Sequence, residues 1–87
     1  VTDVIVDDGI LHLKDADIGN ILFKKNPNHK YNPPKLYIEG MTNISGTVKF
    51  EDMNGVVLIY KNSTHNLNPN KVIGGKIKDR FIPQSPE

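Results

Sequence analysis

The sequence contains no cysteine and no tryptophan. The lack of cysteine excludes a disulfide framework and a zinc site built from thiolates, but it leaves the compartment open, because many extracellular bacterial and viral proteins also have none. No apolar run approaches the ~20 residues that a helix needs to cross a bilayer, so we expect no membrane span. The 3.6-residue period of an amphipathic helix is nearly absent as well. The chain is therefore expected to consist almost entirely of strands and loops.

An excess of charge of one sign is also missing. The 87 residues include 11 Lys or Arg and 10 Asp or Glu, which gives a formal net charge of +1. This balance gives no general electrostatic reason to expect nucleic acid or an anionic membrane as a partner. Hydrophobic residues make up 37% of the chain, which is somewhat below the usual share. A chain of this length has room for one domain with a thin core, so a protein partner or self-association would add stability.

Period-two alternation and short apolar runs indicate strands along most of the chain. Val56 to Tyr60 is apolar without interruption, so both faces of this segment should be covered and it is expected to be the central strand. Two loops rich in Asn and Pro, residues 26–34 and 62–70, interrupt the pattern and are expected at the surface. The expected strands are residues 4–6, 10–14, 20–23, 35–39, 47–51, 56–61, 72–73 and 76–82.

Two turn signals favour antiparallel neighbours. Asp8-Gly9 and Asn54-Gly55 each stand between β-forming runs, where Gly tolerates the positive φ that a tight hairpin turn requires. The sequence therefore predicts an all-β fold, in the form of a small antiparallel meander, sandwich or barrel of about 6–8 short strands.

A loose repeat supports an alternative within the all-β class. The phrase Leu11-His12-Leu13 returns as Leu36-Tyr37-Ile38 and again as Leu58-Ile59-Tyr60. Corresponding apolar residues recur at steps of 22 to 25 residues, as from Leu36 to Leu58 and from Phe23 to Val48. Periods of roughly 20 to 25 residues are typical of solenoids, whose coils supply short strands to stacked sheets. A short β-solenoid with coils of 22–25 residues is the alternative prediction.

The strand pattern defines one β-rich domain over residues 1–82. Residues 83–87 are expected to form a flexible C-terminal tail, because they have nothing to pack. The chain starts at Val1 rather than at Met, which favours a processed or excised part of a larger protein.

No pattern in the sequence indicates catalysis. His12, His29 and His65 lie far apart and show none of the paired spacings of metal ligands. The acidic turn from Asp15 to Asn20 has alternating oxygen ligands before a Gly, but Asn26 stands where an EF-hand loop needs its bidentate Glu. We therefore predict a non-enzymatic chain with no catalytic residues, no metal site and no cofactor.

Basic residues near aromatic side chains form the candidate binding surface. If the fold brings them together, they make a positive patch on which an aromatic ring such as Tyr31, Phe81 or Tyr37 offers a stacking platform for bases or sugars. The residues of this candidate surface are Lys24, Lys25, Lys30, Tyr31, Lys76, Lys78, Arg80 and Phe81.

These features favour a non-enzymatic β-module that mediates attachment or assembly within a larger viral, phage or bacterial surface structure. The reasons are the strand-rich pattern, the Asn- and Pro-rich loops, the thin core and strand edges that gain by pairing with copies or neighbours. A protein partner or self-association is expected, and an extracellular or virion-associated location follows from this hypothesis. The alternative is a small β-barrel that binds nucleic acid or oligosaccharide through basic and aromatic loop residues.

Overall fold

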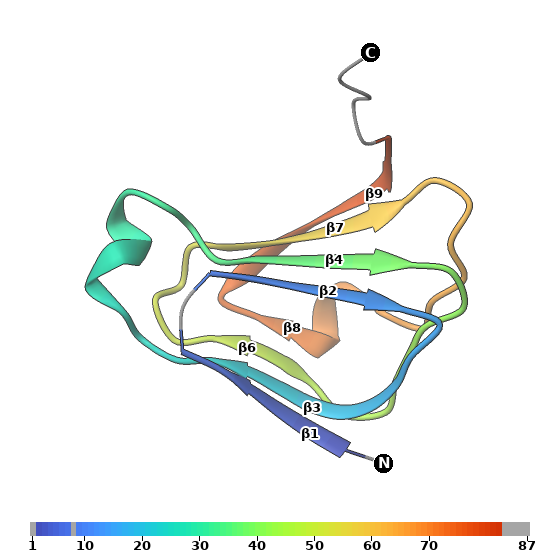
Figure 1. Cartoon of the computed structure of the whole chain (residues 1–87), viewed down its shortest axis with the longest axis horizontal. Helices are drawn as coiled ribbons and strands as arrows, with labels where there is room; N and C mark the ends of the chain where they lie inside the picture. Colours follow the sequence, from blue (N-terminus) through green and yellow to red (C-terminus); the bar gives the residue numbers. More distant parts are fainter. Residues whose placement is uncertain (1, 8, 83–87) are drawn as a thin grey trace.

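All strand pairs in the described part of the chain are parallel. The computed structural model describes residues 2–7 and 9–82, and it is an all-β solenoid in which the chain passes alternately through two sheets (Figure 1). Sheet A contains β1 (Thr2–Val6), β3 (Asp17–Phe23), β6 (Val48–Phe50) and β8 (Val72–Ile73), with β5 (Asn43–Ile44) also paired to β3. Sheet B contains β2 (Ile10–Lys14), β4 (Lys35–Glu39), β7 (Gly55–Tyr60) and β9 (Gly75–Phe81).

Each turn of the solenoid adds one layer to both sheets. The first coil supplies β1 and β2, the second β3 and β4, the third β5, β6 and β7, and the fourth β8 and β9. Two short 3₁₀ helices lie in the predicted surface loops, η1 (Pro27–Lys30) in the loop of residues 26–34 and η2 (Pro69–Lys71) in that of residues 62–70. No helix in residues 2–7 and 9–82 has the length and apolarity to cross a bilayer. The predicted tail, residues 83–87, lies outside the described residues.

The all-β prediction is confirmed, and the arrangement matches the solenoid alternative rather than the antiparallel meander. Neither predicted hairpin forms: β1 pairs with β3 instead of β2, and β7 pairs with β4 and β9 instead of β6. Gly9 and Asn54-Gly55 stand where the chain crosses from one sheet to the other, and Asp8 lies outside the described residues. A tight corner between sheets needs the same permissive backbone as a hairpin turn, and Gly9 has a φ of 94°. At Gly9 the turn signal therefore marks a sharp reversal without specifying which strands become neighbours, whereas Gly55 has no positive φ and lies instead in close contact with the Phe50 ring.

The repeat is reflected in the strand register. Leu11-His12-Leu13 pairs residue for residue with Leu36-Tyr37-Ile38, a step of 25. The third copy is offset by one residue, because Tyr37 pairs with Leu58 and Leu36 with Val57, a step of 21. The step in sheet A ranges from 16, between Thr2 and Ile18, to 27, between Ile21 and Val48. The coils therefore vary in length more than the predicted range of 22–25 residues. The extra or missing residues lie in the corners between the strands.

The core lies between the two sheets. Phe23 and Phe50 stack at its centre with ring centroids 4.6 Å apart, and both are fully buried. A Cβ on Gly55 would collide with the Phe50 ring, so this glycine is required where β7 crosses the aromatic pair. β7 lies between β4 and β9 and is an internal strand, as predicted. Its inner face is buried, but on its outer face only Leu58 is buried, at 7% exposed, while Val56 and Tyr60 are partly exposed, so the second face is covered only in part. The other fully buried Leu, Ile and Val residues are Ile21, Leu36, Ile38, Ile44, Val48, Val57 and Ile59.

Polar side chains continue the inter-coil hydrogen bonding at the corners, where the strands end. In each case a carboxylate or amide oxygen accepts a backbone N–H from a residue 17 to 27 positions away in the sequence, which lies on an adjacent coil. These bonds join the N–H of Asn20 to Asp3 Oδ1 (2.8 Å), Thr47 to Asn20 Oδ1 (3.0 Å), Lys25 to Glu51 Oε1 (2.8 Å), Asn26 to Asp52 Oδ2 (2.9 Å) and Ile44 to Asn66 Oδ1 (2.8 Å).

Replacing Asn66 by Ala tests this corner bonding. The Asn66 amide accepts from the Ile44 N–H at 2.8 Å and donates to the Ile44 carbonyl at 2.9 Å, so it substitutes for a neighbouring strand. We expect Asn66→Ala to lower the free energy of unfolding by about 1–2 kcal/mol, because the Ile44 N–H loses its partner, while the Ile44 carbonyl keeps its hydrogen bond from Lys71 Nζ at 2.7 Å. Urea denaturation followed by circular dichroism measures the change. Asn70→Ala is the matched control, since Asn70 is exposed and its backbone N–H bonds to Asn68; equal losses in the two variants would contradict the prediction.

Candidate functional site

The predicted basic surface consists of two groups on different elements. Lys24, Lys25, Lys30 and Tyr31 all lie between β3 and β4, and Lys30 Nζ is 5.8 Å from the centroid of the Tyr31 ring. Lys76, Lys78, Arg80 and Phe81 lie on β9. In sheet B, β7 stands between β4 and β9.

The register of sheet B arranges its outward side chains in rows that cross the coils. Residues of alternate parity face outward, because their neighbours Leu36, Ile38, Val57 and Ile59 are buried in the core. The first row contains Ile10, Lys35, Val56 and Lys76, and the second contains His12, Tyr37, Leu58 and Lys78. The third row contains the pairs Lys14–Glu39 and Tyr60–Phe81.

Four ring side chains gather across these rows, one from each strand of sheet B. We call His12, Tyr37, Tyr60 and Phe81 the aromatic strip. Its closest centroid separations are 5.5 Å between His12 and Tyr60, 5.6 Å between Tyr60 and Phe81, and 5.7 Å between His12 and Tyr37. These separations fall in the favourable range for aromatic pairs, so the rings stabilise one another on the outer face of the sheet.

A β-bulge places Phe81 in the strip. Leu58 pairs with Lys78, but Tyr60 pairs with Phe81, so two steps on β7 match three on β9. Arg80 takes up the extra residue with a φ of 61°, and the Asp79 carboxylate accepts its backbone N–H at 2.8 Å. A continuous register would set Arg80 opposite Tyr60. The bulge sets Phe81 there instead, which is a known use of bulges beside binding surfaces.

A hollow of about 500 Å³ adjoins the strip at the carboxyl ends of the sheet B strands. Tyr60 and Phe81 supply aromatic surface to it, while Glu39 supplies a carboxylate. We call it the aromatic hollow. Its lining residues are Lys14, Glu39, Gly40, Tyr60, Lys61, Asn62, Ser63, Phe81 and Ile82.

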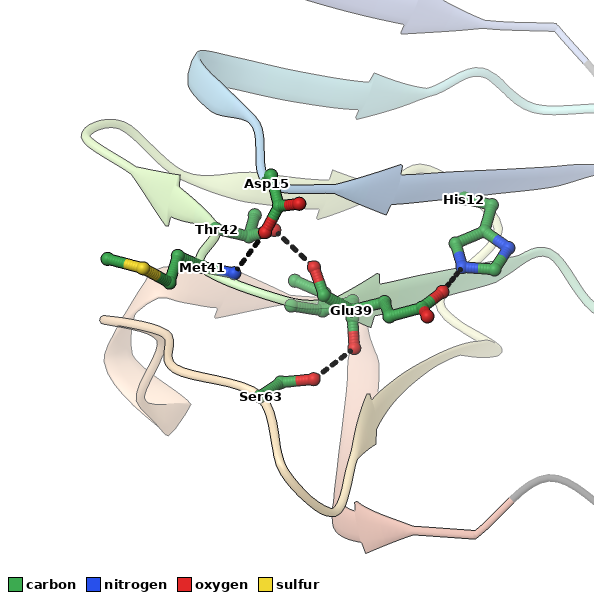
Figure 2. Close-up of polar contacts among 7 residues, drawn as sticks. His12, Asp15, Glu39, Met41, Thr42 and Ser63 are labelled. Carbon is green, nitrogen blue, oxygen red and sulfur yellow. Dashed lines mark hydrogen bonds and ion pairs between the residues drawn. The ribbon is translucent and has the colours of Figure 1, made fainter.

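Hydrogen bonds hold the Glu39 side of the hollow in place (Figure 2). His12 Nε2 lies 2.9 Å from Glu39 Oε1 and orients the carboxylate, which is 33% exposed. The hydroxyl of Thr42 donates to the Glu39 carbonyl at 3.0 Å, and the Asp15 carboxylate accepts the Met41 N–H at 2.8 Å. Ser63 Oγ donates to the Ile38 carbonyl at 3.1 Å, which attaches the third coil to the second. The polar rim of the hollow is therefore built from three successive coils.

The other residues considered from the sequence lie elsewhere. His12 points outward from its strand as predicted, with its side chain 45% exposed. His65 Nδ1 accepts the Leu67 N–H at 3.1 Å, and the His29 side chain lies outside the described part of the structure. Asp15 and Asp17 bond to the third coil, Asp17 through the Asn43 amide at 3.2 Å. Within the described residues, no group of three or more His, Cys, Asp or Glu side chains could hold a metal ion.

In the part of the chain that the structure describes, both ends of the solenoid have unpaired strand edges and partly exposed core residues. β1 and β2 form one end of the two sheets, and β8 and β9 form the other. Inward side chains on these coils, such as Val4, Leu11 and Ile77, are only partly buried, whereas the equivalent Leu36 and Val57 on the middle coils are fully buried. Ile5 is 67% exposed on the first coil and Ile73 is 44% exposed on the last.

No protein-family model, no curated protein and no solved structure matches this chain.

The sequence predicts two of the four rings of the aromatic strip as stacking residues and does not predict the other two. Phe81 and Tyr37 were singled out as stacking residues, and both lie on the outer face of sheet B. Tyr60 was missed because it stood inside an apolar run that gave no indication of which side chains face outward. The solenoid step supplies that signal: with a step of 21, Tyr37 aligns with Leu58, which puts Tyr60 on the same face two residues further on.

Substitutions at Arg80 test the bulge that positions Phe81. A left-handed conformation costs a β-branched residue more than it costs glycine. We expect Arg80→Val to lower the free energy of unfolding by about 1–2 kcal/mol relative to Arg80→Gly. Urea titrations of the two variants measure the difference. If Arg80→Val is as stable as Arg80→Gly, the left-handed bulge is contradicted.

Proposed function

We propose that this chain is a non-enzymatic assembly module that stacks head to tail on further copies of itself. The observation that carries the proposal is that, within residues 2–7 and 9–82, the terminal strands β1, β2, β8 and β9 pair on one edge only and core residues beside them, such as Val4 and Ile77, are only partly buried. Unpaired strand edges are templates for pairing with another chain. A second copy that docks β1 and β2 onto β8 and β9 continues both sheets and covers the core.

The register predicts which residues meet at such a junction. The rows of sheet A run through Ile5, Leu22, Lys49 and Ile73 on the outer face and through Val4, Ile21, Val48 and Val72 on the inner face. Continued by one layer, Val72 lies beside Val4 of the next copy, and Ile73 lies beside Ile5 of the next copy. The most exposed apolar residue of the first coil thus covers the exposed apolar residue of the last strand of sheet A.

The charges of the terminal coils also favour this polarity. Residues 1–15 carry a net charge of −3, and residues 71–82 carry a net charge of +3. Opposite charges on the two ends attract over distances of about a Debye length and disfavour head-to-head contact. The charged residues are Asp3, Asp7, Asp8, Lys14 and Asp15 at one end, and Lys71, Lys76, Lys78, Asp79 and Arg80 at the other.

Sedimentation velocity over a range of protein concentrations tests the proposal. A head-to-tail interface is heterologous and does not close, so the chain should form a concentration-dependent series of oligomers. We expect Ile5→Lys to shift the distribution to the monomer, because the apolar contact with Ile73 is lost and the added positive charge faces the end that carries a net charge of +3. Met41→Lys is the matched control, since Met41 is 74% exposed on a middle coil, and it should associate as the unmodified chain does.

A mixing experiment tests the direction of stacking. Ile73→Glu alone should also be monomeric, whereas an equimolar mixture with Ile5→Lys should associate again, because the introduced carboxylate and the introduced ammonium group then pair across the junction. Circular dichroism confirms that each variant retains its strands. A chain that remains monomeric at all concentrations overturns the proposal, and so does a mixture that stays monomeric while the unmodified chain associates.

A further inference from the structure

We propose that the aromatic hollow binds an acidic oligosaccharide, with one uronic acid residue seated against Tyr60 and Phe81. This inference goes beyond the assembly function, because the hollow is lined by outward side chains from all four strands of sheet B rather than by the strand edges that pair in the proposed junction. The hollow has the volume expected of a small-ligand site, which is about 300–1,000 Å³.

The two aromatic rings select a ligand with an apolar face. The ring centroids of Tyr60 and Phe81 lie 5.6 Å apart at an interplanar angle of 60°, so the two rings are inclined to each other and do not form one flat surface. A pyranose ring presents C–H groups on its face, which aromatic π-systems bind. Rings in the strip are tilted against one another by 41° to 85°, so they offer no continuous parallel surface on which successive nucleotide bases would stack.

The polar groups of the hollow match a ligand that carries both hydroxyls and a carboxylate. Lys14 and Lys61 supply two ammonium groups for charge-assisted hydrogen bonds to an anion. The Glu39 carboxylate, oriented by His12, accepts hydrogen bonds from sugar hydroxyls. Asn62 adds an amide that both donates and accepts. A uronic acid carries hydroxyls that donate to Glu39 and a separate carboxylate that pairs with the lysines, whereas the backbone of DNA has no hydroxyl to donate, so this donor and acceptor set favours a sugar acid over DNA.

The aromatic strip extends the site beyond the hollow. From Tyr60 it continues to Tyr37 and His12 on the neighbouring strands. Lys35 and Lys78 lie in the rows beside it on the same outward face. An oligosaccharide of several uronic acid residues therefore contacts further rings and lysines along the sheet. Its affinity for the protein should increase with the number of its sugar residues.

Titration with tetragalacturonic acid, followed by tyrosine fluorescence and calorimetry, tests the proposal. The chain has no tryptophan, and two of its three tyrosines lie in the strip, so binding is expected to change the emission directly. Phe81→Ala should weaken binding about tenfold. Phe81→Leu keeps apolar bulk without the ring, so a similar loss in this variant shows that the ring itself matters rather than the local fold.

Lysine pairs provide the matched control. Lys14→Ala with Lys61→Ala should also weaken binding about tenfold, whereas Lys24→Ala with Lys25→Ala, which removes equal charge between β3 and β4, should leave the affinity unchanged. All titrations are repeated on Ile5→Lys, so that binding is measured independently of stacking and either proposal can fail alone.

Three results would overturn the site. One is the absence of binding at low ionic strength. Another is equal binding of neutral maltotetraose, which would leave the lysines without a role. The third is tighter binding of an eight-residue oligothymidylate, which would identify the strip as a nucleic-acid surface.

Discussion

The structure depends on hydrogen bonding between the backbone of each coil and that of the next. In a parallel ladder every strand needs a neighbour that runs in the same direction, so the chain must return to the start of the previous strand before it can pair. The second sheet provides that return path. Where the strands end, side chains such as Asn20 and Asn66 take over as partners for backbone N–H groups of the adjacent coil. The loops rich in Asn are thus part of the ladder.

Much of the architecture was predictable from local patterns. Alternation identified most of the strands, and the repeat of Leu11-His12-Leu13 at Leu36-Tyr37-Ile38 gave a pairing that the structure contains residue for residue. The direction of pairing was not predictable from the turns, because Asp-Gly and Asn-Gly report only that the backbone reverses within a few residues. The repeat relates residues that are about one coil apart in the sequence, whereas a turn dipeptide relates adjacent residues. In this chain the repeat predicted the strand pairing correctly, and the turn signals did not.

The candidate site was less predictable for a physical reason. The outward face of a strand follows from its register, and the register changes whenever a corner gains or loses a residue. The step between coils ranges from 16 to 27, so an average period aligns the strands without fixing which side chains lie beside each other. The bulge at Arg80 shifts the register again within β9. Tyr31 and the lysines between β3 and β4 looked equivalent to Phe81 in the sequence, but of these Phe81 is the one with ring neighbours on sheet B among the described residues.

The spacing of contacts also bears on how the chain folds. Each coil touches chiefly the coil before it and the coil after it, at sequence separations of about one coil, and within residues 2–7 and 9–82 no strand pairs with a partner at the far end of the chain. Folding of such an array begins at one pair of adjacent coils and propagates outward as each new coil is laid on a finished edge. The stacked Phe23 and Phe50, which join the second coil to the third, are the natural place for that nucleus. Growth of the folded molecule then proceeds in both directions along its axis, with the terminal coils the last to order and the first to fray.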